Sequence, residues 1–327
     1  MPLAGKHALI LGLASGAILL GLAAANDLIQ KKTGSEPTFR IEVDTVSLPV
    51  VVTTRDNRRI TDLKREDFQV FEDGVPQEIM GFAAVDEPVS VTLVLDTSGS
   101  TESQLKRIQD EAIRFVNLLH RNDSVAVLSF ADKVKLQADF SIDRSKCERG
   151  IRGTLPGGLT ALHDAVYLAL KEVLGPIPER KALVLFTDGV DNRSFAVSAE
   201  ETLELAREAK VIIYSVYFNT EAERNKRAPR LTFPPIQRDR HEEAAAGHDY
   251  LMELAQCSGG LVFDATKMGD LGPAFRNIAQ ELSCLYSIGY NPTNTTRNGQ
   301  FRTVTVKLKK PGLAARTIKG YFPRKDK

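Results

Sequence analysis

One short apolar run, which stops abruptly at a group of oxygen-bearing side chains, restricts the fold more than any other part of the sequence. Residues 89–95 are mostly Val and Leu, which is typical of a strand buried on both faces of an α/β sheet. Asp96, Ser98 and Ser100 follow, and then a helical pattern begins. These side chains are expected at the carboxyl end of a central strand, where open α/β sheets bind ligands. The same residue types form turns and helix caps, so a plain strand-to-helix turn stays open on this segment alone.

Two further loops carry oxygen donors of the same kind. Thr160 follows the pair Gly157-Gly158 and precedes a helical pattern, and Asp188 follows a second buried apolar run over residues 181–187. The three loops together offer two carboxylates and three hydroxyls, which are hard oxygen ligands. Such a set suits Mg²⁺ or Mn²⁺, which take about six oxygens and usually keep some water. The predicted metal site consists of Asp96, Ser98, Ser100, Thr160 and Asp188.

The type and order of these five residues resemble the metal-ion-dependent adhesion site of von Willebrand factor A domains. The resemblance implies that the hydroxyls of Ser98, Ser100 and Thr160 contact the metal directly. It also implies that the carboxylates of Asp96 and Asp188 act mainly through water and through hydrogen bonds to the hydroxyls. Mg²⁺ is the expected ion, with Mn²⁺ or Ca²⁺ as the other choices. Neutral hydroxyls leave net positive charge on the ion, so the last ligand is expected to be an Asp or Glu of a partner protein.

Strand–helix alternation over residues 87–283 predicts a doubly wound, mostly parallel α/β sheet. The flanks, residues 38–86 and 284–323, return to a period of two, and the second flank predicts three strands, over 284–290, 301–309 and 315–322. The stretch DLKREDFQVFEDGVPQEI and the C-terminal flank resemble an Acidobacteria-type group of von Willebrand factor A-related proteins, although a generic hairpin also fits the first stretch. Neither flank has enough strands to bury a core. We therefore expect both flanks to form one β-sandwich, immunoglobulin-like in its N-terminal segment, around an inserted α/β domain.

Residues 1–25 are expected to lie outside the folded domains. Lys6 precedes an uncharged, apolar run over residues 8–25, which ends in three alanines. This pattern fits a secretory signal peptide, and it also reaches the short limit for an uncleaved membrane anchor. Residues 26–37 are expected to be a polar linker. Both interpretations place the remaining chain outside the cytoplasmic membrane, in the periplasm, at the cell surface or in secreted form, with membrane contact only through a possible anchor.

Residues 219–247 interrupt the strand–helix pattern. They contain prolines, many basic residues and few apolar positions, and are expected to form an inserted loop. Their basic charge fits either an acidic partner or a solvated surface. The 3 cysteines are too few and too scattered for a disulfide framework or a zinc site. Cys257 and Cys284 either pair with each other or, like Cys147, serve as small apolar side chains.

Several other functions lack their sequence signals. The net charge is +1 over 327 residues, so no strong positive field indicates nucleic-acid binding. No Gly-x-Gly-x-x-Gly follows the first strand and no Gly-x-Ser-x-Gly elbow surrounds Ser98, so dinucleotide binding and that hydrolase class lack their motifs. His163 lies near Thr160 in the sequence but has no paired base or nucleophile there.

The sequence therefore predicts a protein that is not an enzyme and that binds an unidentified protein ligand through a divalent metal, in adhesion or assembly. A metal-assisted hydrolase is the alternative from a different class, and it requires a general base beside a metal-bound water. A structural envelope scaffold that needs no metal is the other alternative. Asp191 and Asn192 follow Asp188 closely; they either shape the rim of the site or form a turn, and a turn is the expected role.

Overall fold

The computed structural model describes residues 45–323, with gaps at 57, 84–86, 179 and 219–233, and it describes no side chains for residues 234–241. All described residues belong to one compact unit, Asp44–Lys327. The expected signal peptide or anchor (1–25) and linker (26–37) lie outside the described residues. Within the described ranges, no helix combines the length and the apolar character needed to cross a membrane.

The centre of the α/β part is a six-stranded sheet in the order β10-β9-β8-β5-β6-β7. Every neighbouring pair is parallel except β6 and β7, which are antiparallel. The strands are β5 (Ser90–Asp96), β6 (Ser124–Phe130), β7 (Val134–Ser141), β8 (Lys181–Thr187), β9 (Ile212–Phe218) and β10 (Val262–Ala265). Leu93 and Leu95 enter one hydrophobic cluster and Val94 enters another, so β5 is buried on both faces. The predicted mostly parallel α/β sheet is confirmed.

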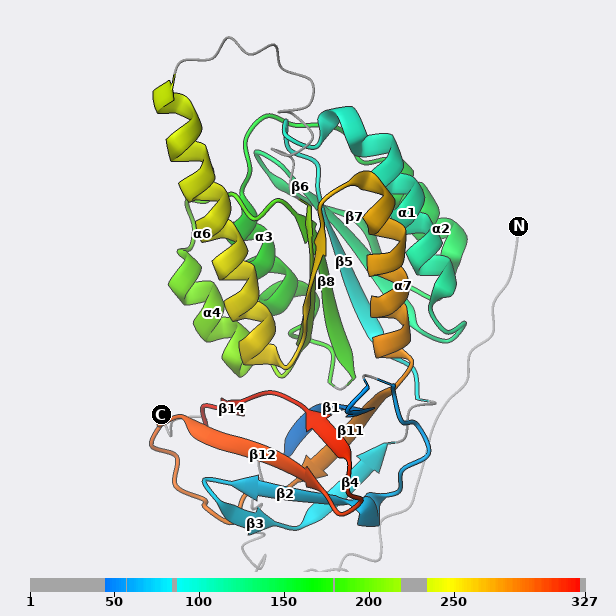
Figure 1. The fold of residues 1–327 in the computed structure, drawn as a ribbon, viewed down its shortest axis with the longest axis vertical. Helices are drawn as coiled ribbons and strands as arrows, with labels where there is room; N and C mark the ends of the chain where they lie inside the picture. Colours follow the sequence, from blue (N-terminus) through cyan, green and yellow to red (C-terminus); the bar gives the residue numbers. More distant parts are fainter. Residues whose placement is uncertain (1–44, 57, 84–86, 179, 219–233, 324–327) are drawn as a thin grey trace, which may run out of the picture. The chain divides into compact units, whose positions relative to one another are not determined.

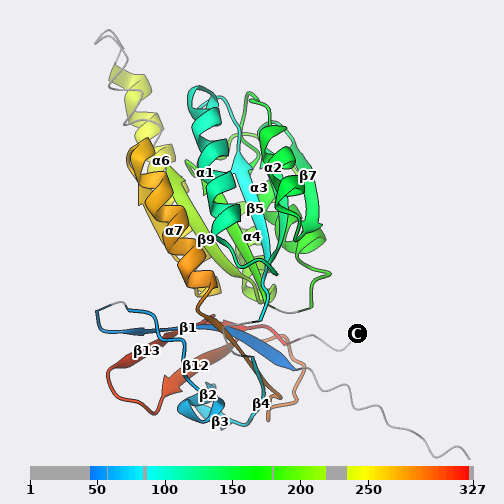
Figure 2. The same cartoon turned by 90° about the vertical axis from the view of Figure 1, so that its right-hand side faces the viewer.

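Helices cover both faces of this sheet (Figures 1 and 2). One face packs against α1 (Leu105–Leu118), α2 (Arg144–Arg152) and α7 (Leu271–Leu282). The other face packs against α3 (Leu162–Leu168), α4 (Ala199–Glu208) and α6 (Pro234–Ser258). Along the chain β5 leads to β6 on one side of the sheet, whereas β8 leads to β9 on the other. The carboxyl ends of β5 and β8 therefore form the switch point of the topology, which is where open α/β sheets bind ligands.

The two ends of the chain build a β-sandwich, as predicted. One sheet has the order β13-β1-β11-β4 and the other β14-β12-β2-β3. Their strands are β1 (Val46–Thr54), β2 (Phe68–Glu72), β3 (Val75–Gln77), β4 (Ile79–Ala83), β11 (Leu285–Tyr290), β12 (Arg302–Leu308), β13 (Leu313–Arg316) and β14 (Gly320–Tyr321). Both sheets contribute to one apolar core, in which Leu48 and Ile288 face Phe68 and Val306. Neither flank could form this core alone, because each sheet takes strands from both.

A buried carboxylate lies inside the sandwich. Glu72, at the end of β2, accepts hydrogen bonds from the hydroxyls of Tyr290 (2.7 Å) and Tyr321 (2.8 Å). It also accepts one at 3.0 Å from the guanidinium of Arg302, whose side chain is 5% exposed against 2% for Glu72. Arg302 donates further to the carbonyls of Asn294 and Thr296. The charge is therefore buried, paired and hydrogen-bonded, which is the condition under which the interior tolerates it.

The last predicted strand, over residues 315–322, is wrong as a single strand. The chain forms β13 beside β1 and then β14 beside β12, in the other sheet. The crossing places Gly320 against the backbone of β12, where an added Cβ would lie 2.1 Å from the carbonyl oxygen of Arg302. The period of two continues through the crossing in the sequence, so the change of sheet carries no periodic signal.

The expected loop over 219–247 is corrected in its second half. Residues 219–233 lie outside the described residues, but α6 begins at Pro234 and continues to Ser258. Proline is tolerated in the first turn of a helix, because the amide hydrogen it lacks would have no partner there. Further along, Leu251 and Leu254 are buried against the sheet. The helix thus begins earlier than the composition of residues 234–247 indicates.

The three cysteines are buried free thiols. Cys147 lies in the cluster beneath α1 and α2, and Cys257 lies in the cluster on the opposite face of the sheet. Burial raises the pKa of each thiol, including Cys284, above its usual range. They therefore fill space as small apolar side chains rather than as reactive groups.

Candidate metal site

Asp96 is the last residue of β5, and its side chain is the centre of the candidate site. The residue is 0% exposed. One carboxylate oxygen, Oδ1, accepts hydrogen bonds from the backbone N–H of Ser98 (2.9 Å) and from its hydroxyl (2.5 Å). The other, Oδ2, accepts one from the hydroxyl of Thr187 at 2.7 Å. The carboxylate is thus fixed from two sides, by its own loop and by the neighbouring strand β8.

The two serines of the first loop lie together. The Oγ atoms of Ser98 and Ser100 are 3.1 Å apart. The loop that carries them is closed by Thr101, whose hydroxyl donates to the carbonyl oxygens of Asp96 (3.2 Å) and Ser98 (2.9 Å). The Ser98 oxygen therefore lies beside the Asp96 carboxylate and the Ser100 oxygen lies beside that of Ser98, and each hydroxyl oxygen carries lone pairs that a ligand could use.

The loop before Thr160 is bound directly to the first loop. The N–H of Gly99 donates to the carbonyl of Gly158 (3.1 Å), and the N–H of Gly157 donates to that of Thr97 (2.8 Å). An added Cβ at Gly157 would lie 2.3 Å from the Cβ of Ala131. This close approach requires glycine, and it brings Thr160 to the edge of the sheet that holds Ser98 and Ser100.

Asp188 follows β8, the strand that pairs with β5. Burial and the nearby carboxylate of Asp188 raise the pKa of Asp96 to about 7, against the opposing effect of the hydrogen bonds from Ser98 and Thr187. Two carboxylates and a set of hydroxyls therefore converge at the β5–β8 edge. A divalent cation fits this donor set, because it would offset the repulsion between the carboxylates and accept the free hydroxyl lone pairs.

Several supporting residues at the site were not predicted. Thr187 holds Asp96, and its position directly before Asp188 is the only sequence signal for it. Asn192 accepts a hydrogen bond from the N–H of Thr160 (2.8 Å) through its side chain and donates one to the carbonyl of Thr160 (3.0 Å) through its own N–H. A turn alone therefore does not describe the role of Asn192, because this residue also connects the Asp188 loop to Thr160.

Asp191 makes a similar tie to the helix that follows Thr160. It accepts hydrogen bonds from Ser194 within its own turn and from the backbone N–H of His163 at 2.9 Å. Burial opposes ionisation of Asp191, but these hydrogen bonds prevail and lower its pKa. The expected turn is present, and it also anchors the start of α3.

His163 lies beside the loop that follows Asp188. Its ring nitrogen Nδ1 lies 3.5 Å from the carboxylate of Asp191, and its ring packs edge-on against Tyr250 at 4.8 Å. Burial lowers its pKa despite the nearby carboxylates of Asp191 and Asp164. The imidazole thus lies between Tyr250 and the Asp191 carboxylate.

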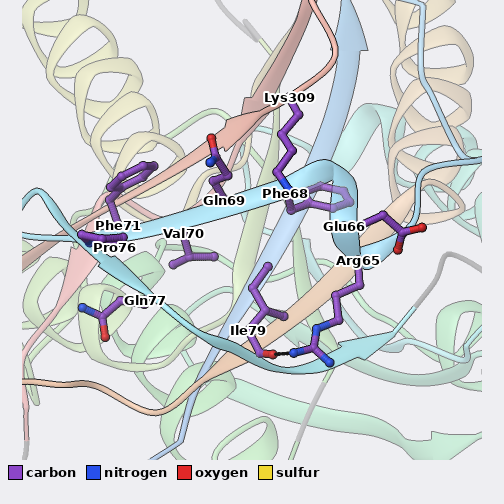
Figure 3. A pocket seen from close by; sticks show the side chains of 10 residues that line it. All are labelled: Arg65, Glu66, Phe68, Gln69, Val70, Phe71, Pro76, Gln77, Ile79 and Lys309. Carbon is purple, nitrogen blue, oxygen red and sulfur yellow. Dashed lines mark hydrogen bonds between the residues drawn. The ribbon is translucent and has the colours of Figure 1, made fainter.

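No group of three or more His, Cys, Asp or Glu side chains suited to a metal occurs in the part of the chain that the structure describes. The candidate site at the β5–β8 edge differs from such a group because it combines two carboxylates with hydroxyls. A separate hollow of about 340 Å³ lies on the sandwich, over β2 and β3 (Figure 3). Glu66 is the one carboxylate among its lining residues, and Arg65 and Lys309 flank it, so its chemistry does not match a divalent cation.

Comparison with known proteins gives a family match for the α/β part. Residues 90–271 match the family model described as the von Willebrand factor type A domain. A search of the curated proteins found no match.

Similar folds occur among solved structures. A von Willebrand factor type A protein from Catenulispora acidiphila is 12% identical, with a TM-score of 0.48 over 79% of this chain and 74% of that chain. The vWF domain of the type V pili tip protein Mfa5 from Porphyromonas gingivalis is 15% identical, with a TM-score of 0.45 over 59% of this chain and 94% of that chain. Proximal thread matrix protein 1 from the mussel byssus is 16% identical, with a TM-score of 0.45 over 61% of this chain. The match covers 49% of the mussel protein, about half of its length.

Proposed function

The chain belongs to the von Willebrand factor type A domain family, and from that membership we propose that it binds a protein partner through a divalent cation at the β5–β8 edge. One observation carries this proposal. Asp96 is a fully buried carboxylate beside Asp188, and the two paired serine hydroxyls adjoin it. Two acidic groups in a buried position repel each other unless a positive charge lies between or beside them.

The residues divide into two roles in this proposal. Ser98, Ser100 and Thr160 would hold Mg²⁺ or Mn²⁺ directly through neutral oxygens. Asp96 and Asp188 would act through water and through hydrogen bonds, and the 2.5 Å bond from the Ser98 hydroxyl to Asp96 supports that assignment. With few charged ligands, the ion keeps net positive charge and favours a carboxylate as its last ligand. The partner would therefore present an Asp or Glu.

The biological setting follows the N-terminal sequence. We propose that the protein acts outside the cytoplasmic membrane, in adhesion or assembly, because the apolar run over residues 8–25 has the pattern of an export segment. Catalysis is not part of the proposal. His163 is the histidine nearest to Thr160 in the sequence, and its imidazole contacts the ring of Tyr250 and the carboxylate of Asp191.

Calorimetric titration of Mg²⁺ and Mn²⁺ into the metal-free chain tests the function. We expect one saturable site whose affinity rises when a short peptide with a central Glu is present, because cation and carboxylate bind cooperatively and the coupling is reciprocal. The same peptide with Gln in place of Glu is the matched control and should leave the affinity unchanged. A folded chain that binds neither ion, with or without the Glu peptide, would contradict the proposal and favour a structural scaffold.

A further inference from the structure

Three large apolar side chains are exposed on the loops that carry the candidate metal site. Leu155 is 70% exposed, Leu159 is 42% exposed and Phe195 is 77% exposed. Single exposed apolar residues are normal on a soluble protein, but several gathered around a binding site indicate an interaction surface. We call these three residues the apolar rim.

Leu155 and Leu159 bracket the segment that is bound to the Ser98 loop. Between them lie Gly157 and Gly158, whose backbones pair with Thr97 and Gly99. The N–H groups of Gly158 (2.9 Å) and Leu159 (3.1 Å) also donate to the carboxylate of Asp132. The backbone beneath both leucines is therefore fixed, and their exposure results from an ordered loop conformation.

Phe195 is held over the start of the helix that follows Thr160. Its N–H donates to the carboxylate of Asp164 at 3.4 Å, and the hydroxyl of Ser194 accepts from the N–H of Asp164 at 3.0 Å. Asp164 lies in the first turn of α3. The backbone of Phe195 thus lies beside the same helix terminus that Thr160 precedes.

Arg193 connects the Phe195 side of the rim with the Leu159 side. Its guanidinium lies 4.6 Å from the centre of the Phe195 ring. It also acts on Asp132, whose pKa is lowered first by the N–H groups of Gly158 and Leu159 and further by this guanidinium. Since Asp132 in turn holds Leu159, the two sides of the rim belong to one surface.

Two charges on this surface have opposite signs and interact, because the guanidinium of Arg193 lowers the pKa of Asp132. A partner that already supplies a carboxylate to the cation would therefore gain little from further charged contacts on the rim. It would gain most from apolar side chains, because burying exposed Leu and Phe removes apolar area from water. Buried aromatic residues are also frequent hot spots of binding interfaces.

We propose that Leu155, Leu159 and Phe195 select partners in which the metal-binding Asp or Glu lies between apolar side chains. This inference rests on the proposed function and specifies the chemistry of the partner. The occupant is a segment of another protein with one acidic residue and flanking residues such as Leu or Phe.

Fluorescence anisotropy of labelled peptides against the purified full chain tests the selection. The probes are a peptide with a central Glu flanked by Leu and Phe, the same peptide with Ser flanks, and both with Gln at the centre. In Mn²⁺ we expect the apolar-flanked Glu peptide to bind about ten-fold or more tightly than the Ser-flanked one. In EDTA both should lose binding. The triple variant Leu155→Ser, Leu159→Ser, Phe195→Ser should lose the preference while its calorimetric affinity for Mn²⁺ stays unchanged.

A matched control removes exposed apolar residues elsewhere. Leu136 is 54% exposed and Ile142 is 61% exposed, on β7 and just after it, so Leu136→Ser with Ile142→Ser should keep the preference. Equal binding of Ser-flanked and apolar-flanked Glu peptides would overturn the rim while leaving the metal function intact. Equal binding of Glu and Gln peptides would overturn the proposed function itself. Mn²⁺-dependent dimerisation in sedimentation, lost in the triple variant, would overturn the partner class, because the rim would then serve a second copy of the chain.

Discussion

Replacing Asp96 or Asp188 by Asn should lower the affinity for Mg²⁺ and Mn²⁺ by about 10- to 100-fold or more. Changes to groups that orient metal ligands typically cost affinity on that scale. The Asp96 carboxylate accepts from the hydroxyl of Ser98 and from that of Thr187. Asn can keep part of this geometry but carries no charge to attract the cation. The measurement is calorimetric titration of each metal-free variant beside the parent chain.

The fold of these variants should survive, which makes the result interpretable. Removing one of two repelling buried carboxylates does not destabilise the metal-free protein through charge, because the repulsion disappears with it. Asp139 is an exposed carboxylate on β7, and Asp139→Asn is the matched control that should bind the cation as the parent does. Parent-like affinity in Asp96→Asn would show that the cation, if bound, uses another site.

Replacing Glu72 by Leu should lower the free energy of unfolding by about 3–5 kcal/mol, because it leaves the buried Arg302 guanidinium without its counter-charge. Both side chains are nearly inaccessible, at 2% and 5% exposure. The hydroxyls of Tyr290 and Tyr321 lose an acceptor as well. Urea unfolding of the parent and the variant measures the effect.

Two companions separate the buried charge from a general effect of the substitution. Glu78→Leu changes an exposed carboxylate in the same sandwich and should alter stability by less than about 0.5 kcal/mol. The double variant Glu72→Leu, Arg302→Leu should recover much of the loss, since a buried pair replaced as a whole is often tolerated. If Glu72→Leu were as stable as Glu78→Leu, the sandwich would not depend on this ion pair.

The α/β sheet was predictable because the residues of each central strand alone indicate that both of its faces are buried. Residues 89–95 are mostly Val and Leu and residues 182–186 are all apolar, which is typical of strands that are covered on both faces. The residues of the candidate metal site could be proposed for a related reason. Each lies directly after a strand or before a helix, so chain order alone brings Asp96, Thr160 and Asp188 to one edge of the sheet.

The residues that sequence reasoning missed act through contacts between loops. Asn192 is hydrogen-bonded to Thr160, 32 residues away in the sequence, and Thr187 is hydrogen-bonded to Asp96, 91 residues away. Nothing in the local pattern distinguishes such side chains from ordinary turn residues. The same limit applies to β13 and β14, where one alternating segment divides between two sheets. It applies to the first half of α6 as well, which is helical although its composition favours a loop.

A crystal structure of the full chain grown with Mn²⁺ and a Glu-containing peptide tests metal-dependent binding at the β5–β8 edge directly. The anomalous difference map locates manganese without reference to any assumed ligand. We expect one peak at the β5–β8 edge, in direct contact with the hydroxyls of Ser98, Ser100 and Thr160 and with the peptide carboxylate. Asp96 and Asp188 should not contact the ion directly. A peak elsewhere on the protein, or a map without a peak while the peptide is bound, would contradict metal-dependent binding at this site.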